Sequence, residues 1–234
     1  YADKSIRIDS ESAIANYVIS SIYRNQNKLI KSKKHINKAI TIDPKNVRYI
    51  LELACINRDL GEREKAYKLC LEAVKLQPKL SYAYSILGVM QRDLNFFSEA
   101  KNSLLKAIDI DSNEETYYLN LAAIYIDLDE IENAEKMIQK SIQINPYSPE
   151  AHINLGNIFR DSGRIEEAKN AIENALKLRP NFPIAYYALS VLSRSSLDND
   201  FYNQLFSDDI LIGQSNLGLA HLYFARSNFK HKEG

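Results

Sequence analysis

The charged dipeptide Arg-Asp returns at fixed places in the sequence. It occurs in "INRDLG" (56–61), "MQRDLN" (90–95) and "NIFRDSG" (157–163). An Arg guanidinium offers a planar fork of hydrogen-bond donors, and an Asp carboxylate accepts such donors. These side chains are therefore suited to polar recognition. Their spacings of 34 and 68 residues predict that the whole chain keeps a 34-residue period.

Four prolines confirm this period at the sequence level, with Ser112 in the place of a missing member: Pro44, Pro78, Pro146 and Pro180. Two columns of small residues precede them at fixed distances, namely Ser20, Ala54, Gly88, Ala122 and Gly156, and Ser32, Ala66, Ala100, Ala134 and Ala168. Between these columns lies a column of Asn, Gly or Asp: Asn27, Gly61, Asn95, Asp129 and Gly163. Small residues allow two helices to approach closely, and Gly, Asn and Asp tolerate the left-handed conformation that ends a helix. Each period is therefore predicted to be a helix–turn–helix unit.

The composition favours an all-helical protein without a broad nucleic-acid-binding surface. Gly and Pro are few in the 234 residues, and Lys+Arg and Asp+Glu each number 30. A net charge of zero argues against a wide positive field, although it leaves room for a local basic strip. No apolar run approaches the length of a membrane span and no signal peptide opens the chain, so a cytoplasmic location without membrane contact is expected. Cys55 and Cys70 can form a disulfide, but reduced, packed thiols are the favoured interpretation.

These columns resemble the tetratricopeptide repeat family, including its Leu-Gly pair in "INLGNIF" (153–159). The resemblance implies a right-handed superhelical solenoid whose first helices line a concave groove. Residues 1–12 then form the end of a preceding repeat, residues 13–196 the solenoid, and residues 197–234 a divergent helical cap or partial repeat. The repeats are expected at 13–46, 47–80, 81–114, 115–148 and 149–182, with a partial sixth from 183. The family often has Trp at the fourth place of the first helix, and this chain has none.

Helical periodicity then indicates which residues face the groove. At about 100° per residue, Tyr84, Leu87, Gly88 and Gln91 form the packing side of their helix. Opposite them lie Tyr82, Ser85, Ile86, Val89, Arg92 and Asp93. The predicted groove therefore carries an arginine column, which Ile126 interrupts, an acidic column and several tyrosines. Its candidate binding residues are Arg24, Arg58, Asp59, Tyr82, Arg92, Asp93, Asn120, Asp127, Asn154, Asn157, Arg160, Asp161 and Tyr187.

Two interpretations of the charged columns remain open. In the first, each Asp pairs with an Arg of the same or the next repeat, and the pairs set superhelical pitch. In the second, the Arg and Asp side chains hold the side chains and backbone of a partner.

Asn120 and Asn154 occupy one groove column, with Asn157 nearby, and an amide can bind a peptide backbone without reading its sequence. This arrangement resembles part of the asparagine ladder of O-linked N-acetylglucosamine transferases. The family's clamp for C-terminal carboxylates is not supported, because the columns that would hold its Lys and Asn contain Tyr17, Leu51, Ser85, Leu119 and Ile153.

No pattern in the sequence predicts catalysis within this chain. The four histidines, His35, His152, His221 and His231, lack metal-ligand spacing, and His152 is expected in the core. No phosphate-binding Gly loop, nucleophile elbow or redox Cys pair is found. No catalytic, metal or cofactor-binding residue is therefore predicted.

The expected function is a scaffold that binds a protein or an extended peptide in its concave groove. The alternative is a substrate-recruiting region of a larger transferase, because "NQLFSDDIL" (203–211) and "LYFARSNFKHKEG" (222–234) resemble the last repeat before a sulfotransferase domain in bacterial, notably cyanobacterial, proteins. A glycosyltransferase is the second choice for such a domain. The helix predicted within 216–234 has apolar side chains on more than one side. Copies of the chain are therefore also expected to associate through exposed ends of the solenoid.

Overall fold

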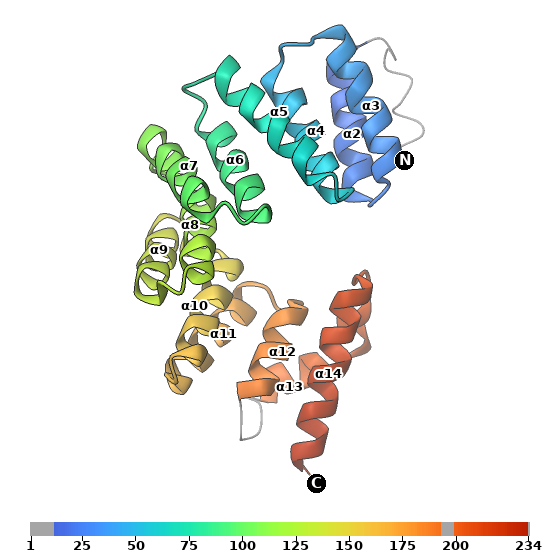
Figure 1. Ribbon diagram of the computed structural model, residues 1–234. Helices are drawn as coiled ribbons and strands as arrows, with labels where there is room; N and C mark the ends of the chain where they lie inside the picture. The colour runs from blue at the N-terminus through green and yellow to red at the C-terminus, as the bar shows by residue number, and fades with distance from the viewer. Residues whose placement is uncertain (1–11, 193–198, 234) are drawn as a thin grey trace. The chain divides into compact units, whose positions relative to one another are not determined.

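The computed structural model describes residues 12–192 and 199–233. These residues form α-helices and one 3-10 helix, without a strand among them, so the all-α prediction is confirmed. The chain divides into two compact units, Tyr1–Leu128 and Asp129–Gly234. Figure 1 shows the first unit in blue to green and the second in yellow to red.

The first unit is a stack of helical hairpins. Helix α2 packs against α3, α4 against α5, and α6 against α7, and each second helix also contacts the first helix of the next hairpin (Figure 1). The last helix of this unit, α8, packs on α7. The helices are α2 (Ala13–Asn25), α3 (Leu29–Ile42), α4 (Val47–Asp59), α5 (Arg63–Leu76), α6 (Ser81–Asp93), α7 (Phe97–Ile110) and α8 (Glu115–Asp127).

The second unit begins in the same way and ends differently. Helix α9 packs on α10, α10 pairs with α11, α11 packs on α12, and α12 packs on the long last helix. Its elements are α9 (Ile131–Ile144), α10 (Pro149–Asp161), α11 (Ile165–Leu178), α12 (Pro183–Leu192), α13 (Asn199–Phe206), the 3-10 helix η1 (Asp208–Leu211) and α14 (Asn216–Glu233).

The predicted turn column is confirmed at all five positions. Its residues have positive φ angles: Asn27 56°, Gly61 81°, Asn95 63°, Asp129 59° and Gly163 74°. In four of the turns, the N–H of the following residue donates a hydrogen bond to a carbonyl in the last turn of the first helix. The N-to-O distance is 2.8 Å in each, as from Glu62 to Asn57. The left-handed residue thus ends each first helix and points the chain into the second helix.

The two small columns meet where the helices of a hairpin cross. A Cβ added to Gly88 would lie 2.8 Å from Leu104 Cγ and 3.2 Å from the Ala100 carbonyl oxygen. In the first hairpin, Ser32 Oγ donates to the Ser20 carbonyl at 2.8 Å, and Ser20 Oγ donates to the Ser32 carbonyl at 2.9 Å. Close backbone approach therefore explains why only small residues occupy these columns.

The column that lacks Trp makes a polar contact instead. The Tyr118 hydroxyl donates to the Ser112 carbonyl and the Tyr186 hydroxyl to the Pro180 carbonyl, both at 3.1 Å. His152 has a ring nitrogen 3.2 Å from the Pro146 carbonyl. The prediction that His152 is a core residue is wrong, because the side chain is only half-buried and serves this contact at the repeat junction.

The C-terminal elements close over α12 with a small core. Leu205, Ile210, Leu222 and Phe229 pack with Tyr186, and each is at most 5% exposed. Residues 199–211 form two short helices, α13 and η1.

The proposed end of an earlier repeat, residues 1–12, also lies outside the described residues except for Ser12. The Ser12 hydroxyl accepts a hydrogen bond from the Ala15 N–H and caps α2. In the described part of the chain no helix is long and apolar enough to cross a membrane. Cys55 and Cys70 are free and buried, so the prediction of reduced, packed thiols is confirmed.

Candidate functional site

The arginine and acidic columns form a ladder in the first unit. Each Arg stands in the last turn of a first helix, and its guanidinium reaches the Asp that ends the first helix of the next hairpin. Arg24 Nε donates to Asp59 Oδ2 at 2.7 Å, and Arg58 and Arg92 make the equivalent bonds to Asp93 and Asp127. The interpretation in which each Asp pairs with an Arg of another repeat therefore holds for residues 12–128.

The ladder is a surface feature. The arginine side chains are 30% to 41% exposed. The three pairs lie between helices that also contact each other directly. Although burial acts against its charged form, the hydrogen bond that Arg24 donates to Asp59 raises the pKa of Arg24. For Arg92 the bond to Asp127 is the main cause of a raised pKa. Both guanidiniums are fixed in place and remain partly open to a partner.

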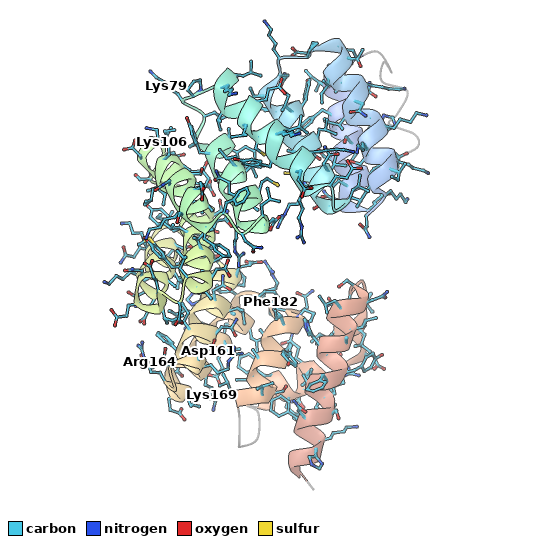
Figure 2. All side chains as sticks on the ribbon, in the orientation of Figure 1. Lys79, Lys106, Asp161, Arg164, Lys169 and Phe182 are labelled. Atoms are coloured by element: carbon cyan, nitrogen blue, oxygen red, sulfur yellow. The ribbon has the colours of Figure 1, made fainter. Side chains whose placement is uncertain are left out.

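The arginine column is interrupted after Arg92. Ile126, on α8 of the first unit, occupies the next arginine position and is 43% exposed. Arg160 Nε instead donates to Asp161 Oδ1 of its own helix at 2.9 Å. Figure 2 labels Asp161 at the end of α10.

A pocket of about 280 Å³ opens beside the ladder. Four first helices and one second helix contribute to it. Its lining residues are Arg24 from α2, Cys55 and Arg58 from α4, Tyr82, Ile86, Val89, Met90 and Arg92 from α6, Leu104 from α7, and Asn120 and Ile124 from α8. The arrangement combines an aliphatic and sulfur-containing lining with three guanidiniums.

Two other ionisable side chains of the pocket wall, Cys55 and Tyr82, are held in neutral forms. Burial raises the pKa of the Cys55 thiol to about 11. Burial also raises the pKa of the Tyr82 phenol to about 12, while 48% of the residue surface stays exposed. At neutral pH both side chains therefore offer uncharged surface, which suits an apolar group and not a nucleophilic reaction.

Glu52 borders the ladder and was not predicted as a site residue. Its carboxylate lies 3.6 Å from Arg24 Nη1 and accepts a hydrogen bond from the Ser21 hydroxyl at 3.4 Å. Burial raises the pKa of Glu52, and Arg24 opposes this effect. Its position in the repeat is the sequence signal that could have identified it, because Glu52 occupies the column that holds Asn120 and Asn154 in other repeats.

The remaining predicted residues divide between the units. Asn120 Nδ2 donates to Ser85 Oγ at 3.4 Å, which links α8 to α6. The expectation that Ser85 faces the groove is wrong, because it is 3% exposed beneath this contact. Asn154 and Asn157 are half-buried on α10. In the second unit the Tyr187 ring stacks on His221 of α14 at 5.2 Å between ring centroids.

A second pocket is formed by α9, α10 and α11 of the second unit. Its volume is about 350 Å³, with His152, Leu155 and Phe159 from α10 and amide side chains from α9 and α11 around it. None of the predicted groove residues lines this pocket.

Among the described residues, no group of His, Cys, Asp and Glu is arranged to hold a metal ion.

Similar structures share the fold of this chain. The structure of MamA is 24% identical, with a TM-score of 0.56 over 69% of this chain and 95% of that chain. A thermophilic TPR protein from Thermus thermophilus is 16% identical, with a TM-score of 0.71 over 77% of this chain and 98% of its own. YrrB, described as a TPR protein with an unusual peptide-binding site, is 16% identical, with a TM-score of 0.53 over 80% and 96% of the two chains.

The repeats themselves identify the family. No curated protein shows significant similarity to the chain. The tetratricopeptide repeat profile matches residues 13–46, 47–80 and 115–148, and a TPR repeat profile matches residues 156–192. These matches cover more than half of the chain, and the helical hairpins agree with the fold of the similar structures. The chain belongs to the tetratricopeptide repeat family.

Proposed function

We propose that this chain is a protein-binding scaffold and that the pocket of the first unit holds an extended peptide of a partner. In this proposal the face of α2, α4, α6 and α8 that carries the pocket is the concave groove. The single observation that supports it most is the pocket lining, which joins aliphatic side chains to three partly exposed guanidiniums. Such a combination suits a peptide with one apolar side chain between polar backbone groups.

The size of the pocket favours a side chain over a cofactor. Its volume of about 280 Å³ lies below the roughly 300–1,000 Å³ of typical small-molecule pockets. Ile86 and Val89 are only partly buried and are available for contact. An aliphatic or aromatic anchor residue of the peptide would cover them and remove their apolar surface from water.

The ladder leaves donors for the peptide backbone. Arg58 and Arg92 use Nε and Nη2 to bind Asp93 and Asp127, and neither Nη1 group bonds another residue in the described part of the chain. A guanidinium fixed by a carboxylate is pre-organised to donate its remaining N–H groups to a carbonyl. The two interpretations of the charged columns are thus compatible, since the same pairs can join the repeats and hold a partner.

The predicted site residues of the second unit do not line the pocket formed by α9, α10 and α11. Asn154, Asn157, Arg160, Asp161 and Tyr187 therefore stay predictions. The transferase alternative also stays a prediction, because none of the features of residues 12–192 and 199–233 bears on a further domain.

The experiment selects peptides from a random phage-displayed library on the immobilised full chain and measures their affinity by fluorescence anisotropy. Ile86→Asp places a charge in the pocket, and Leu105→Asp is the matched control on α7, where Leu105 is 43% exposed outside the pocket. Ile86→Asp is expected to weaken binding about tenfold or more, while Leu105→Asp leaves it unchanged. Circular dichroism confirms that both variants are folded at the assay temperature. Equal effects of the two changes, or an unchanged affinity of Ile86→Asp, would contradict the proposal.

A further inference from the structure

The first hairpin carries a net positive charge in a chain that is neutral overall. Residues 12–46 contain seven Lys and Arg residues and a single acidic residue, Asp43. Residues 115–148 contain the opposite balance, with two Lys and six Asp or Glu residues. The basic residues of the first hairpin are Arg24, Lys28, Lys31, Lys33, Lys34, Lys38 and Lys45.

Three of these lysines share the exposed face of α3. At about 100° per residue, Lys31, Lys34 and Lys38 fall within one arc of the helix. Ile30 and Ile42 border this arc and are 73% and 50% exposed. Helix α3 packs mainly on α2 and α4, and the exposed arc faces away from its buried residues Ser32, Ile36 and Ala39.

Within residues 12–192 and 199–233, the three lysines of this arc form no ion pair. Lys33 binds Glu62, the residue that precedes α5, at 2.7 Å, and Lys31 Nζ lies 5.7 Å from the centre of the Tyr23 ring. Lys34 and Lys38 make no ion pair with any described residue. Burial lowers the pKa of His35, and the charges of Lys38 and Lys34 lower it further, as expected for a locally positive surface.

The pattern works against the stability of α3 itself. The other second helices, α5, α7, α9 and α11, carry Glu in the first turn, whereas α3 has no acid there and begins after Lys28. Like charges at i, i+4 and cations at a helix N-terminus are both unfavourable. A bound anionic partner would relieve both effects, so the lysines are better explained by recognition than by folding.

We propose that the exposed face of α3, made of Ile30, Lys31, Lys34, Lys38 and Ile42, binds an acidic segment of a partner protein. The lysines span eight residues, about 10 Å along the helix, which matches acidic side chains placed one turn apart on a partner helix. The two isoleucines suit the aliphatic side chains of a protein better than a phosphate backbone. This surface belongs to a second helix and is separate from the pocket, so its test is independent of the groove.

A short acidic segment fits the rest of the molecule better than a large polyanion does. Residues 81–114 hold five acids and three bases, and residues 115–148 are more acidic still. A duplex nucleic acid or an anionic membrane extends beyond one hairpin and would be repelled by these acids. An acidic peptide contacts α3 alone.

The test measures binding of a fluorescein-labelled oligo-L-glutamate peptide to the full chain by fluorescence anisotropy at low ionic strength. The variant is Lys31→Gln/Lys34→Gln/Lys38→Gln, and the matched control is Lys106→Gln/Lys136→Gln/Lys140→Gln. The control lysines are also exposed on second helices, and Lys106 on α7 is labelled in Figure 2. Gln keeps the helix propensity of Lys, so both variants are expected to fold as the wild type, which circular dichroism checks.

The α3 variant is expected to lose about tenfold or more in affinity, and the control is expected to bind like the wild type. Wild-type binding should weaken as salt is added. Three results would overturn the proposal. These are an absence of oligo-glutamate binding, an equal loss in the control variant, and tighter binding of duplex DNA or phosphatidylglycerol vesicles than of oligo-glutamate.

Discussion

At the scale of single residues, Ser141 stands in a column that otherwise contains Ala39, Ala73, Ala107 and Ala175. It is fully buried, and its hydroxyl oxygen has no hydrogen-bond partner among the residues that the structure describes. Ser141→Ala removes an unsatisfied polar group, so it is expected to raise the free energy of unfolding by about 1–2 kcal/mol. Denaturant unfolding followed by circular dichroism measures the change.

The matched control is Ser32→Ala. The Ser32 hydroxyl is equally buried, but it bonds the Ser20 carbonyl at 2.8 Å, so this change should destabilise the protein. A loss of stability in Ser141→Ala would show that its hydroxyl has a favourable contact.

Glu52 gives a pH-dependent prediction at the same scale. Burial raises its pKa in the folded protein, so the folded state binds the proton more tightly than the unfolded state does. Its contribution to stability is therefore present below the unfolded pKa and is lost as the pH rises through the folded pKa. Glu52→Gln should match the wild type at low pH and become relatively more stable as the pH rises to neutrality. Urea unfolding at a series of pH values tests this, and a difference that does not change with pH would refute it.

At the scale of the helices, close approach within a hairpin controls the packing of α6 on α7. The Cβ of Gly88→Ala would lie 2.8 Å from Leu104 Cγ and 3.2 Å from the Ala100 carbonyl oxygen. The change is expected to cost about 1–3 kcal/mol in unfolding free energy. In a Leu104→Ala background the added methyl group has room, so the same change should cost less. Thermal and denaturant unfolding of the four proteins measures both costs, and an equal cost in both backgrounds would argue against this contact.

The Arg-Asp ladder is expected to join helices without adding much stability. Arg92 and Asp127 keep 41% and 26% side-chain exposure, and exposed ion pairs contribute about 0–1 kcal/mol. A double-mutant cycle of Arg92→Ala and Asp127→Ala should therefore give a coupling energy of about 1 kcal/mol or less, which falls as salt is added. A coupling of several kcal/mol would mean that the ladder is a main source of stability.

The sequence predicted the turns and close contacts well, because each depends on one residue at a fixed place. Asn95 and Gly163 reveal a left-handed turn by their type alone, and Gly88 reveals a close approach. Ser85 was misplaced because helical angles within α6 do not say where α8 will lie. The pocket was only partly foreseen, since Leu104 and Ile124 reach it from neighbouring helices that no single column describes.

At the scale of the whole molecule, the two binding proposals use different surfaces of the same unit. The pocket lies mainly on first helices of Tyr1–Leu128, and the basic face lies on α3, a second helix. One partner can therefore occupy the pocket while an acidic segment occupies α3. The second unit contributes its own hairpins and the aromatic contact of Tyr187 with α14.

The most direct test of the central claim is to locate a bound peptide on the full chain. A peptide selected by phage display is resynthesised with benzoylphenylalanine in place of its apolar anchor, irradiated in the complex and mapped by mass spectrometry. The account predicts cross-links to α6 within the pocket, at Ile86, Val89 or Met90, and their loss in Ile86→Asp. Cross-links confined to the second helices or to residues 129–233, unchanged by Ile86→Asp, would contradict it.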